Sequence, residues 1–259
     1  MKQYIGKYNI ALIVLDSLRH DVAEAEMCNG DTPNLKELFS KGWEKRHSPG
    51  SFTYAAHSAF FAGFMPTPVD ALASKERLFA SDFVGSETIG DQTYCFPEGN
   101  VVNALQREGY HTICIGGVGF FNKQNALSRV FPDLFCESHW STELGVTGQD
   151  STEKQFALAR KQLAGISEKK SFLYINVSAI HQPNCHYLEQ KEDTIESHAA
   201  ALRYVDRCLP ELLEELQKRQ TFLIICSDHG SLYGEEGFTG HRVGHEAVYT
   251  VPYGEQLLE

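Results

Sequence analysis

Two histidines and an aspartate form the chemically most distinctive part of the sequence. Asp228 and His229 directly follow the apolar run Leu223–Cys226 and one serine, and His241 lies twelve residues after His229. A carboxylate beside an imidazole suits a divalent metal, because both groups offer lone pairs on short side chains. Aspartate and glycine also favour tight turns, so a strand-to-loop turn explains Asp228 and Gly230 about equally well.

A second carboxylate and a hydroxyl occur earlier in the chain. Asp16 directly follows the apolar run Ala11–Leu15, where a charge is unfavourable unless it is paired, metal-bound or caps a helix. Thr53 lies at or next to the start of a helix expected over Ala55–Phe61, among unpaired N–H groups at the positive end of the helix dipole. This position suits a nucleophile that attacks an anionic phosphoryl group, although a simple capping threonine is the alternative.

Two further histidines have positions that are informative only in combination. His57 follows Thr53 by four residues and therefore shares its helix face. His181 closely follows the apolar run Phe172–Val177 and precedes Pro183. A packed histidine and a surface loop histidine are the ordinary alternatives for these two residues.

The apolar runs indicate the elements that must position these residues. Four runs are expected to be buried strands: Ile10–Leu15, Thr112–Ile115, Phe172–Val177 and Phe222–Cys226. Helical patterns precede the last three strands, over Val101–Glu108, Thr152–Leu163 and Thr194–Lys218, and Pro210 is expected to kink or divide the longest. Strands alternating with helices predict an α/β fold with a mainly parallel sheet and helices on both faces. Ligands bind beyond the carboxyl ends of such strands.

The remaining segments give weaker indications. Residues 66–99 show little periodicity and are expected to form an excursion off the sheet. No convincing linker interrupts the chain, so a single domain over residues 1–259 is expected. The run Gly116–Gly119 either cradles a substrate or forms tight turns. Lys123 and Arg242 either bind an anion or are solvated charges.

Composition limits the classes of partner. The chain has 259 residues, 42% of them hydrophobic, and a formal net charge of −11 from 34 acidic and 23 basic residues. This charge and the lack of a Lys/Arg-rich run argue against nucleic acid, whereas a small anionic ester remains compatible if metal ions reverse the local charge. No apolar run approaches membrane length. Seven scattered cysteines, an odd number, indicate free thiols in a reducing cytoplasm. The oligomeric state is left open.

Taken together, these features resemble the alkaline phosphatase/sulfatase superfamily, in order and over nearly the whole chain. The matching segments are Asn9–Asp21, Thr32–Leu35, Ser51–Pro66, Phe172–Pro183 and Ser227–Pro252. The nearest likeness is to short, uncharacterised bacterial sulfatase-like hydrolases. The resemblance implies an alkaline-phosphatase-like fold. Because the chain ends soon after Pro252, the C-terminal subdomain of many sulfatases is expected to be lacking.

The resemblance also implies roles for individual residues. One divalent metal, zinc or manganese, would be bound by Asp16, Asp228, His229 and the hydroxyl of Thr53. Thr53 takes the place of the sulfatase cysteine that becomes formylglycine, and is expected to be the nucleophile. His181 and His241 would bind a second metal or act in catalysis, and His57 and His245 would contact the substrate.

The expected activity is metal-dependent hydrolysis or transfer of phosphate mono- or diesters through a phospho-threonine intermediate. Some departures from the family pattern keep alternatives open. Ser17 stands where sulfatases carry a second carboxylate, and His181 has no clear aspartate partner for a full second metal site. The sulfatase maturation motif is absent, which argues against the alternative of a sulfate-ester hydrolase. The other alternative is a degenerate, non-catalytic metal-binding member.

Overall fold

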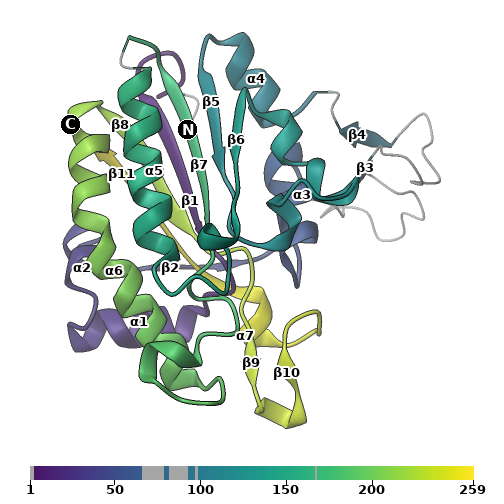
Figure 1. Ribbon diagram of the computed structural model, residues 1–259, viewed down its shortest axis with the longest axis vertical. Coiled ribbons are helices and arrows are strands. Elements are labelled where there is room, and N and C mark those ends of the chain that lie inside the picture. Colours follow the sequence, from purple (N-terminus) through teal and green to yellow (C-terminus); the bar gives the residue numbers. More distant parts are fainter. Residues whose placement is uncertain (1–2, 66–78, 82–92, 97–98, 167) are drawn as a thin grey trace.

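The computed structural model describes residues 3–65, 79–81, 93–96, 99–166 and 168–259 (Figure 1). Within them, seven strands form the main sheet in the order β2-β11-β8-β1-β7-β5-β6. These strands are β1 (Asn9–Leu15), β2 (Glu44–His47), β5 (His111–Ile115), β6 (Glu137–His139), β7 (Ser171–Val177), β8 (Thr221–Cys226) and β11 (Thr250–Leu258). Separate two-stranded pairs are formed by β3 (Phe79–Ser81) with β4 (Tyr94–Phe96), and by β9 (Leu232–Tyr233) with β10 (Thr239–Gly240).

The expected mainly parallel sheet is confirmed. Each of the four predicted strands is present and begins one residue earlier than the apolar run. β1 pairs in parallel with β7 and β8, and β5 pairs in parallel with β6 and β7. Among these seven described strands, β11 runs in the direction opposite to the other six and pairs antiparallel with β8 and β2. Most of the expected excursion over residues 66–99 lies outside the described residues.

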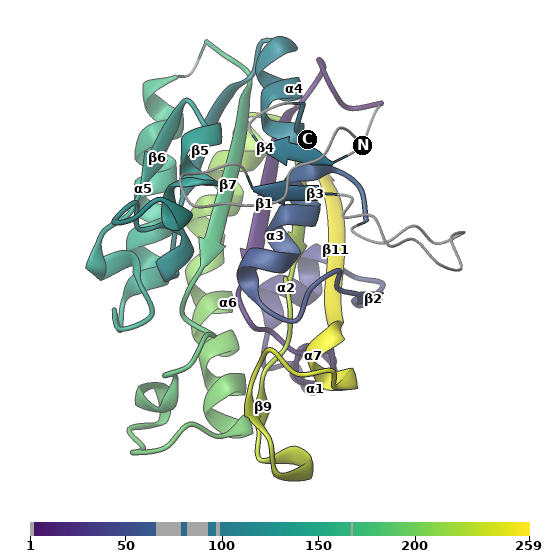
Figure 2. The ribbon, with the colours of Figure 1, turned by 90° about the vertical axis from the view of Figure 1, so that its right-hand side faces the viewer.

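Helices cover both faces of the sheet, as predicted (Figure 1, Figure 2). They are α1 (His20–Asn29), α2 (Pro33–Leu38), α3 (Thr53–Ala62), α4 (Val101–Arg107), α5 (Ser151–Gly165), α6 (Ile195–Lys218) and α7 (Glu246–Tyr249). Short 3-10 helices occupy Gly119–Phe121, Leu127–Arg129, Pro132–Leu134, Thr142–Leu144, Cys185–Leu188 and Glu235–Gly237. α6 continues through Pro210, so the proline does not divide it. None of the described helices combines the length and apolar character needed to cross a bilayer.

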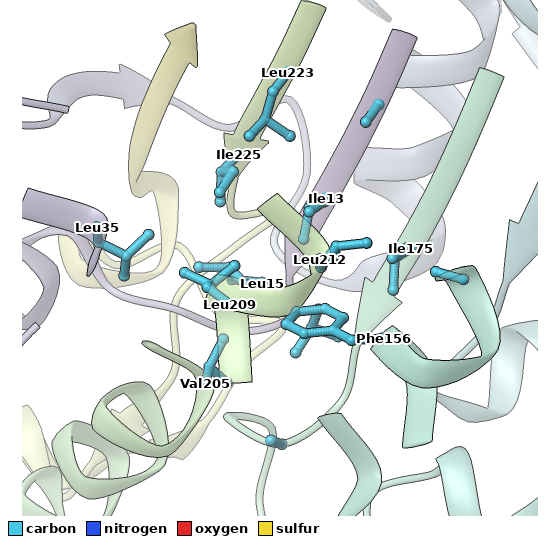
Figure 3. Close-up of a cluster of buried hydrophobic side chains, with 14 of the residues drawn as sticks. Ile13, Leu15, Leu35, Phe156, Ile175, Val205, Leu209, Leu212, Leu223 and Ile225 are labelled. Carbon is cyan, nitrogen blue, oxygen red and sulfur yellow. The ribbon is translucent and has the colours of Figure 1, made fainter. Parts of the chain in front are cut away.

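Alternating strand residues build two hydrophobic cores. On one face, Ile13, Ile175 and Ile225 pack with α1, α2, α5 and α6 (Figure 3). On the other face, Phe172 and Tyr174 pack with α3 and α4 in a cluster rich in aromatic rings. This two-sided burial fixes the strand register, because a slip of one residue would exchange the two faces.

Candidate metal and nucleophile site

Three neighbouring strands deliver the predicted metal ligands to one edge of the sheet. Val14 on β1 pairs with Cys226 on β8, so Asp16 and Asp228 leave adjacent strands at the same level. The backbone N–H of Asp16 donates to the carbonyl of Val177 at the end of β7, at 3.1 Å. Ligand atoms of Asp16, Asp228 and His229 all lie within 4.8 Å of one another, and the three residues are buried.

Asp228 has one satisfied and one unsatisfied carboxylate oxygen. Its Oδ1 accepts hydrogen bonds from the backbone N–H groups of Ser17, at 3.1 Å, and of His229, at 3.0 Å. Its Oδ2 has no hydrogen-bond partner among the described residues and lies 3.5 Å from His229 Nε2. A buried carboxylate oxygen without a donor is unfavourable, so this atom needs a positive partner.

Asp16 accepts hydrogen bonds from three side chains. Ser17 Oγ donates to Oδ1 at 3.0 Å, and Asn176 Nδ2 donates to Oδ2 at 2.9 Å. Thr53 Oγ1 donates to the same Oδ2 at 3.3 Å. The carboxylate is therefore held in one orientation against the hydroxyl that the sequence identified as the candidate nucleophile.

The environments of the two carboxylates shift their pKa values in opposite directions. Burial alone raises the pKa of Asp16, but the imidazoles of His181 and His229 and the Asn176 hydrogen bond outweigh it and lower the pKa. Burial and the negative charge of Asp16 raise the pKa of Asp228 well above its ordinary value. Two carboxylates so close repel each other, and a cation between them would remove that repulsion.

His229 presents a lone pair to the same point. Its Nδ1 lies 2.9 Å from the carbonyl of Gly230, so Nδ1 carries the proton and donates it there. Nε2 is then an acceptor, 3.4 Å from Thr53 Oγ1 and 3.8 Å from Asp16 Oδ1. Burial lowers the pKa of His229 and keeps the ring neutral. A neutral imidazole whose other nitrogen is bonded to a carbonyl is the usual form of a metal-binding histidine.

This donor set fits a divalent cation. Two buried carboxylates, a neutral imidazole nitrogen and a hydroxyl converge, and the free Oδ2 of Asp228 is one of the converging atoms. Oxygen and nitrogen donors in this mixture suit zinc or manganese. Asp16, Asp228, His229 and Thr53, the predicted ligands of the first metal, are thus brought together.

The start of α3 places Thr53 at the site. Thr53 is the first residue of α3 and is buried. Ser48 Oγ hydrogen-bonds to the carbonyls of Asp228 and Gly50, the latter at 2.8 Å, which ties the segment before α3 to the end of β8. A Cβ on Gly50 would lie 2.5 Å from the backbone nitrogen of Ala56, so only glycine allows the chain to approach the helix so closely.

A cavity of about 650 Å³ opens onto Thr53 and is also lined by His181 and His241. The His241 ring centre lies 4.6 Å from that of His229 and 5.5 Å from that of His181. Burial, together with the neighbouring imidazoles, lowers the pKa of His241 to about 4. The structure therefore gathers both histidines beside the three-ligand cluster.

His57 and His245, the two predicted substrate contacts, are not among the described residues that line the cavity, and their role toward a substrate stays a prediction. His57 is fully buried; its Nδ1 donates to the Thr53 carbonyl at 2.7 Å, and its Nε2 accepts from Tyr174 Oη at 2.5 Å. Burial lowers its pKa to about 4. His245 caps α7 by accepting from the Ala247 N–H at 3.0 Å and is not among the described residues that line the cavity. Both histidines hold helix ends.

Two open questions from the sequence are also answered by contacts. Lys123 Nζ donates to the backbone and side-chain oxygens of Ser138, whereas Arg242 lines the cavity with its guanidinium 5.1 Å from the Phe52 ring centre. Close packing explains Gly117 in the glycine run, because a Cβ there would lie 2.3 Å from the Asn176 carbonyl oxygen, whereas Gly119 lines the cavity. Cysteines in the described residues are free thiols.

Comparisons with known proteins agree with this architecture. A sequence profile of the family described as Sulfatase matches residues 8–253. No curated protein sequence matches the chain.

Solved structures with a similar fold include two domains of phosphoethanolamine-transferase type. The C-terminal periplasmic domain of phosphoethanolamine transferase EptC from Campylobacter jejuni has a TM-score of 0.64 at 15% identity, covering 96% of this chain and 79% of that one. The C-terminal periplasmic domain of EcEptC from Escherichia coli, in complex with Zn, has a TM-score of 0.67 at 12% identity, covering 98% and 74%. A protein in the alkaline phosphatase superfamily from Vibrio parahaemolyticus has a TM-score of 0.61 at 19% identity, covering 97% and 61%. These likenesses establish the fold.

Proposed function

Because the chain belongs to the Sulfatase family, within the alkaline phosphatase superfamily, we propose that it is a metal-dependent phosphoester hydrolase or phosphotransferase. The observation that carries the proposal is the position of Thr53 Oγ1, 3.3 Å from Asp16 Oδ2 and 3.4 Å from His229 Nε2, at the wall of the cavity. A hydroxyl placed at a helix start beside a cation-binding cluster is suited to nucleophilic attack on an anionic ester.

Asp16, Asp228, His229 and Thr53 would hold one divalent cation, zinc or manganese. When bound, the cation would lower the pKa of the Thr53 hydroxyl and offset negative charge on the ester oxygens. His181 and His241 would bind a second cation or protonate the leaving group, since both line the cavity.

In the proposed reaction, Thr53 Oγ1 attacks phosphorus and the bond from phosphorus to the leaving oxygen breaks. Its hydroxyl proton passes to Asp16 Oδ2, toward which the hydroxyl already donates a hydrogen bond. The leaving oxygen takes a proton from His181, because the lowered pKa of His241 leaves that ring neutral. Water or an acceptor alcohol then attacks phosphorus and the bond from phosphorus to Thr53 Oγ1 breaks. Oγ1 takes back its proton from Asp16, and the attacking oxygen passes its own proton to the histidine that protonated the leaving group.

Turnover of p-nitrophenyl phosphate and bis-p-nitrophenyl phosphate, with added zinc or manganese, tests this proposal. Thr53→Ala should lower kcat at least about 10³-fold, because it removes the nucleophile, whereas Thr53→Ser should retain activity within about tenfold because it keeps the hydroxyl. Thr239→Ala is the matched control, since Thr239 lines the same cavity and its side chain forms no hydrogen bond to the cluster among the described residues. Equal rates for wild type and Thr53→Ala on every ester would rule out Thr53 as the nucleophile.

The family match also supports a second candidate, hydrolysis of sulfate esters. The two candidates share the site and differ in the ester group that it accepts. Sulfate release from p-nitrophenyl sulfate that exceeds phosphate release from the matching phosphate would reverse the ranking. A phosphoryl group recovered on the peptide that contains Thr53 would support the first candidate.

A further inference from the structure

Asn176 is a fully buried amide near the end of an otherwise apolar strand. On β7, Phe172 and Tyr174 face the aromatic core beside α3, and Asn176 continues the same alternating row. Tyr174 reaches His57 from this row. Asn176, one step nearer the carboxyl end, reaches Asp16.

Both ends of the Asn176 amide are engaged. Its Oδ1 accepts from the backbone N–H of Val118 at 3.0 Å, and its Nδ2 donates to Asp16 Oδ2 at 2.9 Å. The amide orientation follows from its partners, because a backbone N–H only donates and a carboxylate only accepts. Asp16 Oδ2 is also the atom that accepts the Thr53 hydroxyl, so Asn176 and the proposed nucleophile share one carboxylate oxygen.

The other partner of Asn176 belongs to the cavity wall. Val118 and Gly119 line the cavity. The preceding residue, Gly117, packs against the Asn176 carbonyl and receives a hydrogen bond on its own carbonyl from Trp140 Nε1 at 3.0 Å. One side chain therefore joins the cavity wall to the carboxylate that orients the hydroxyl.

Sheet formation alone does not account for an amide at this position. The β1–β7 ladder is made by backbone groups, and an apolar side chain would bury more favourably in the row of Phe172 and Tyr174. A buried amide is unfavourable by roughly 2–7 kcal/mol unless its hydrogen bonds are satisfied. The bonds that Asn176 makes lead to the candidate site.

We propose that Asn176 is a positioning residue, which holds Asp16 in the orientation that Thr53 and a bound cation require and fixes the Val118–Gly119 wall to it. The inference rests on the proposed function for its kinetic consequence. Its consequence for cation binding does not depend on the proposed function. Removing a residue that hydrogen-bonds to a metal ligand typically lowers metal affinity or activity by about 10- to 100-fold.

The test uses two substitutions at Asn176 and one control. Asn176→Leu is of similar size and removes both hydrogen bonds, and Asn176→Ala replaces it if leucine is not accommodated. Asn176→Asp keeps the acceptor for Val118, removes the donor to Asp16 and places a second carboxyl group against it. Ser178→Ala is the control, because Ser178 lies two residues away, is equally buried, and its hydroxyl donates to the Leu144 carbonyl, at 2.8 Å, rather than to the cluster.

The first measurement is the Kd of Zn²⁺ for the metal-free protein, determined by titration calorimetry. Asn176→Leu should raise the Kd about 10- to 100-fold, while Ser178→Ala should bind like wild type. The second measurement is p-nitrophenyl phosphate turnover at saturating Zn²⁺, where Asn176→Asp should lower kcat about 10-fold or more with a smaller change in KM. Melting temperatures establish that each variant is folded.

The outcomes separate this inference from the proposed function. A wild type without Thr53-dependent turnover would remove the proposed function, and the Zn²⁺ affinity of Asn176→Leu or Asn176→Ala would still decide the role of Asn176. An unchanged Kd in that variant, or kcat of Asn176→Asp within threefold of wild type, would overturn the inference. A Zn²⁺ affinity lowered equally by Ser178→Ala would also overturn it.

Discussion

The two buried carboxylates differ in how the fold satisfies them. Three side-chain donors surround Asp16. Asp228 receives two backbone donors on one oxygen and leaves the other without a partner in the described part of the chain. Such an unsatisfied buried charge lowers stability, and sites that bind ligands commonly carry this kind of local cost. The unpaired Oδ2 of Asp228 therefore lowers the stability of the fold and at the same time is available to bind a cation.

Gly230 occupies a position where any side chain would collide with neighbouring backbone. A Cβ there would lie 1.9 Å from the Ala247 carbonyl oxygen. Gly230→Ala should therefore lower the free energy of unfolding by about 1–3 kcal/mol and displace His229, whose Nδ1 bonds to the Gly230 carbonyl. Urea denaturation measures this change. Gly244→Ala is the control because its Cβ would meet nothing within 4 Å; equal losses for both variants would contradict the prediction.

Residues that act through spatial neighbours were difficult to find in the sequence. Asp16, Thr53 and His229 follow apolar runs or begin a helix, which marks them locally. Asn176 carried a usable signal, a polar side chain inside an apolar strand. Ser48 carried none, because its partner Asp228 is remote in sequence. The burial of His57 could not be predicted, because the aromatic rings that surround it come from several separate segments.

At the scale of elements, the hairpin of β9 and β10 delivers His241 to the cavity. Figure 1 shows this hairpin projecting beyond the main sheet. The hairpin is anchored twice: Arg19, a largely buried side chain, forms an ion pair with Glu235 in its turn, and Tyr233 Oη on β9 lies 2.8 Å from His198 Nδ1. His241 therefore depends on contacts made by α6 and by the segment before α1.

His198 makes the hairpin anchor sensitive to acid. It is fully buried, accepts the Arg19 N–H at Nε2, and has a pKa lowered to about 3 by burial and then by the Arg19 charge, with Asp21 and Glu235 opposing. In the unfolded chain it titrates near 6.5, so the unfolded state binds the proton first and stability falls as pH drops below about 6.5.

Comparison with His198→Gln measures this contribution, because glutamine offers both a donor and an acceptor without titrating. Between pH 6 and pH 4, wild type should lose about 2–3 kcal/mol more free energy of unfolding than the variant. Urea denaturation across this pH range gives the two curves. Parallel pH dependence in the two proteins would contradict the assignment.

The central strands were predictable, whereas the strands toward the edges were not. β1, β5, β7 and β8 are buried on both faces and read as apolar runs. β2 consists of four exposed polar residues, and β6 has three half-buried ones, so neither has an apolar pattern. β11 contains Pro252 and Gly254, which are unfavourable in strands. These strands form because they pair with segments that are remote in the sequence, which a short stretch of sequence does not reveal.

For the whole molecule, the candidate site lies where the fold class predicts a ligand. Asp16, Asp228 and the contacts of β7 lie at the carboxyl ends of three adjacent central strands, and α3 supplies Thr53 from the face. Four separate parts of the chain meet there. A ligand bound to all four would oppose unfolding of the entire sheet.

Cation binding should therefore raise the stability of the whole protein. Zn²⁺ at about 100 times its Kd should add about 2.7 kcal/mol to the free energy of unfolding, visible as a higher melting temperature that EDTA reverses. Asp228→Asn should abolish this increase. Without metal, it should melt at the same temperature as wild type or higher, because it removes a buried negative charge beside Asp16. A Zn²⁺-dependent increase that survives in Asp228→Asn would place the cation elsewhere.

Asp16 and Asp228 each stand two positions beyond the last residue pair that joins β1 to β8, which is Val14 with Cys226. Neighbouring strands lie about 4.8 Å apart, so backbone spacing sets the distance between the two carboxylates. A slip of one residue would bring Leu15 or Ser17 opposite Asp228. The spacing of the two strands thus limits the size of the ion that both carboxylates can reach.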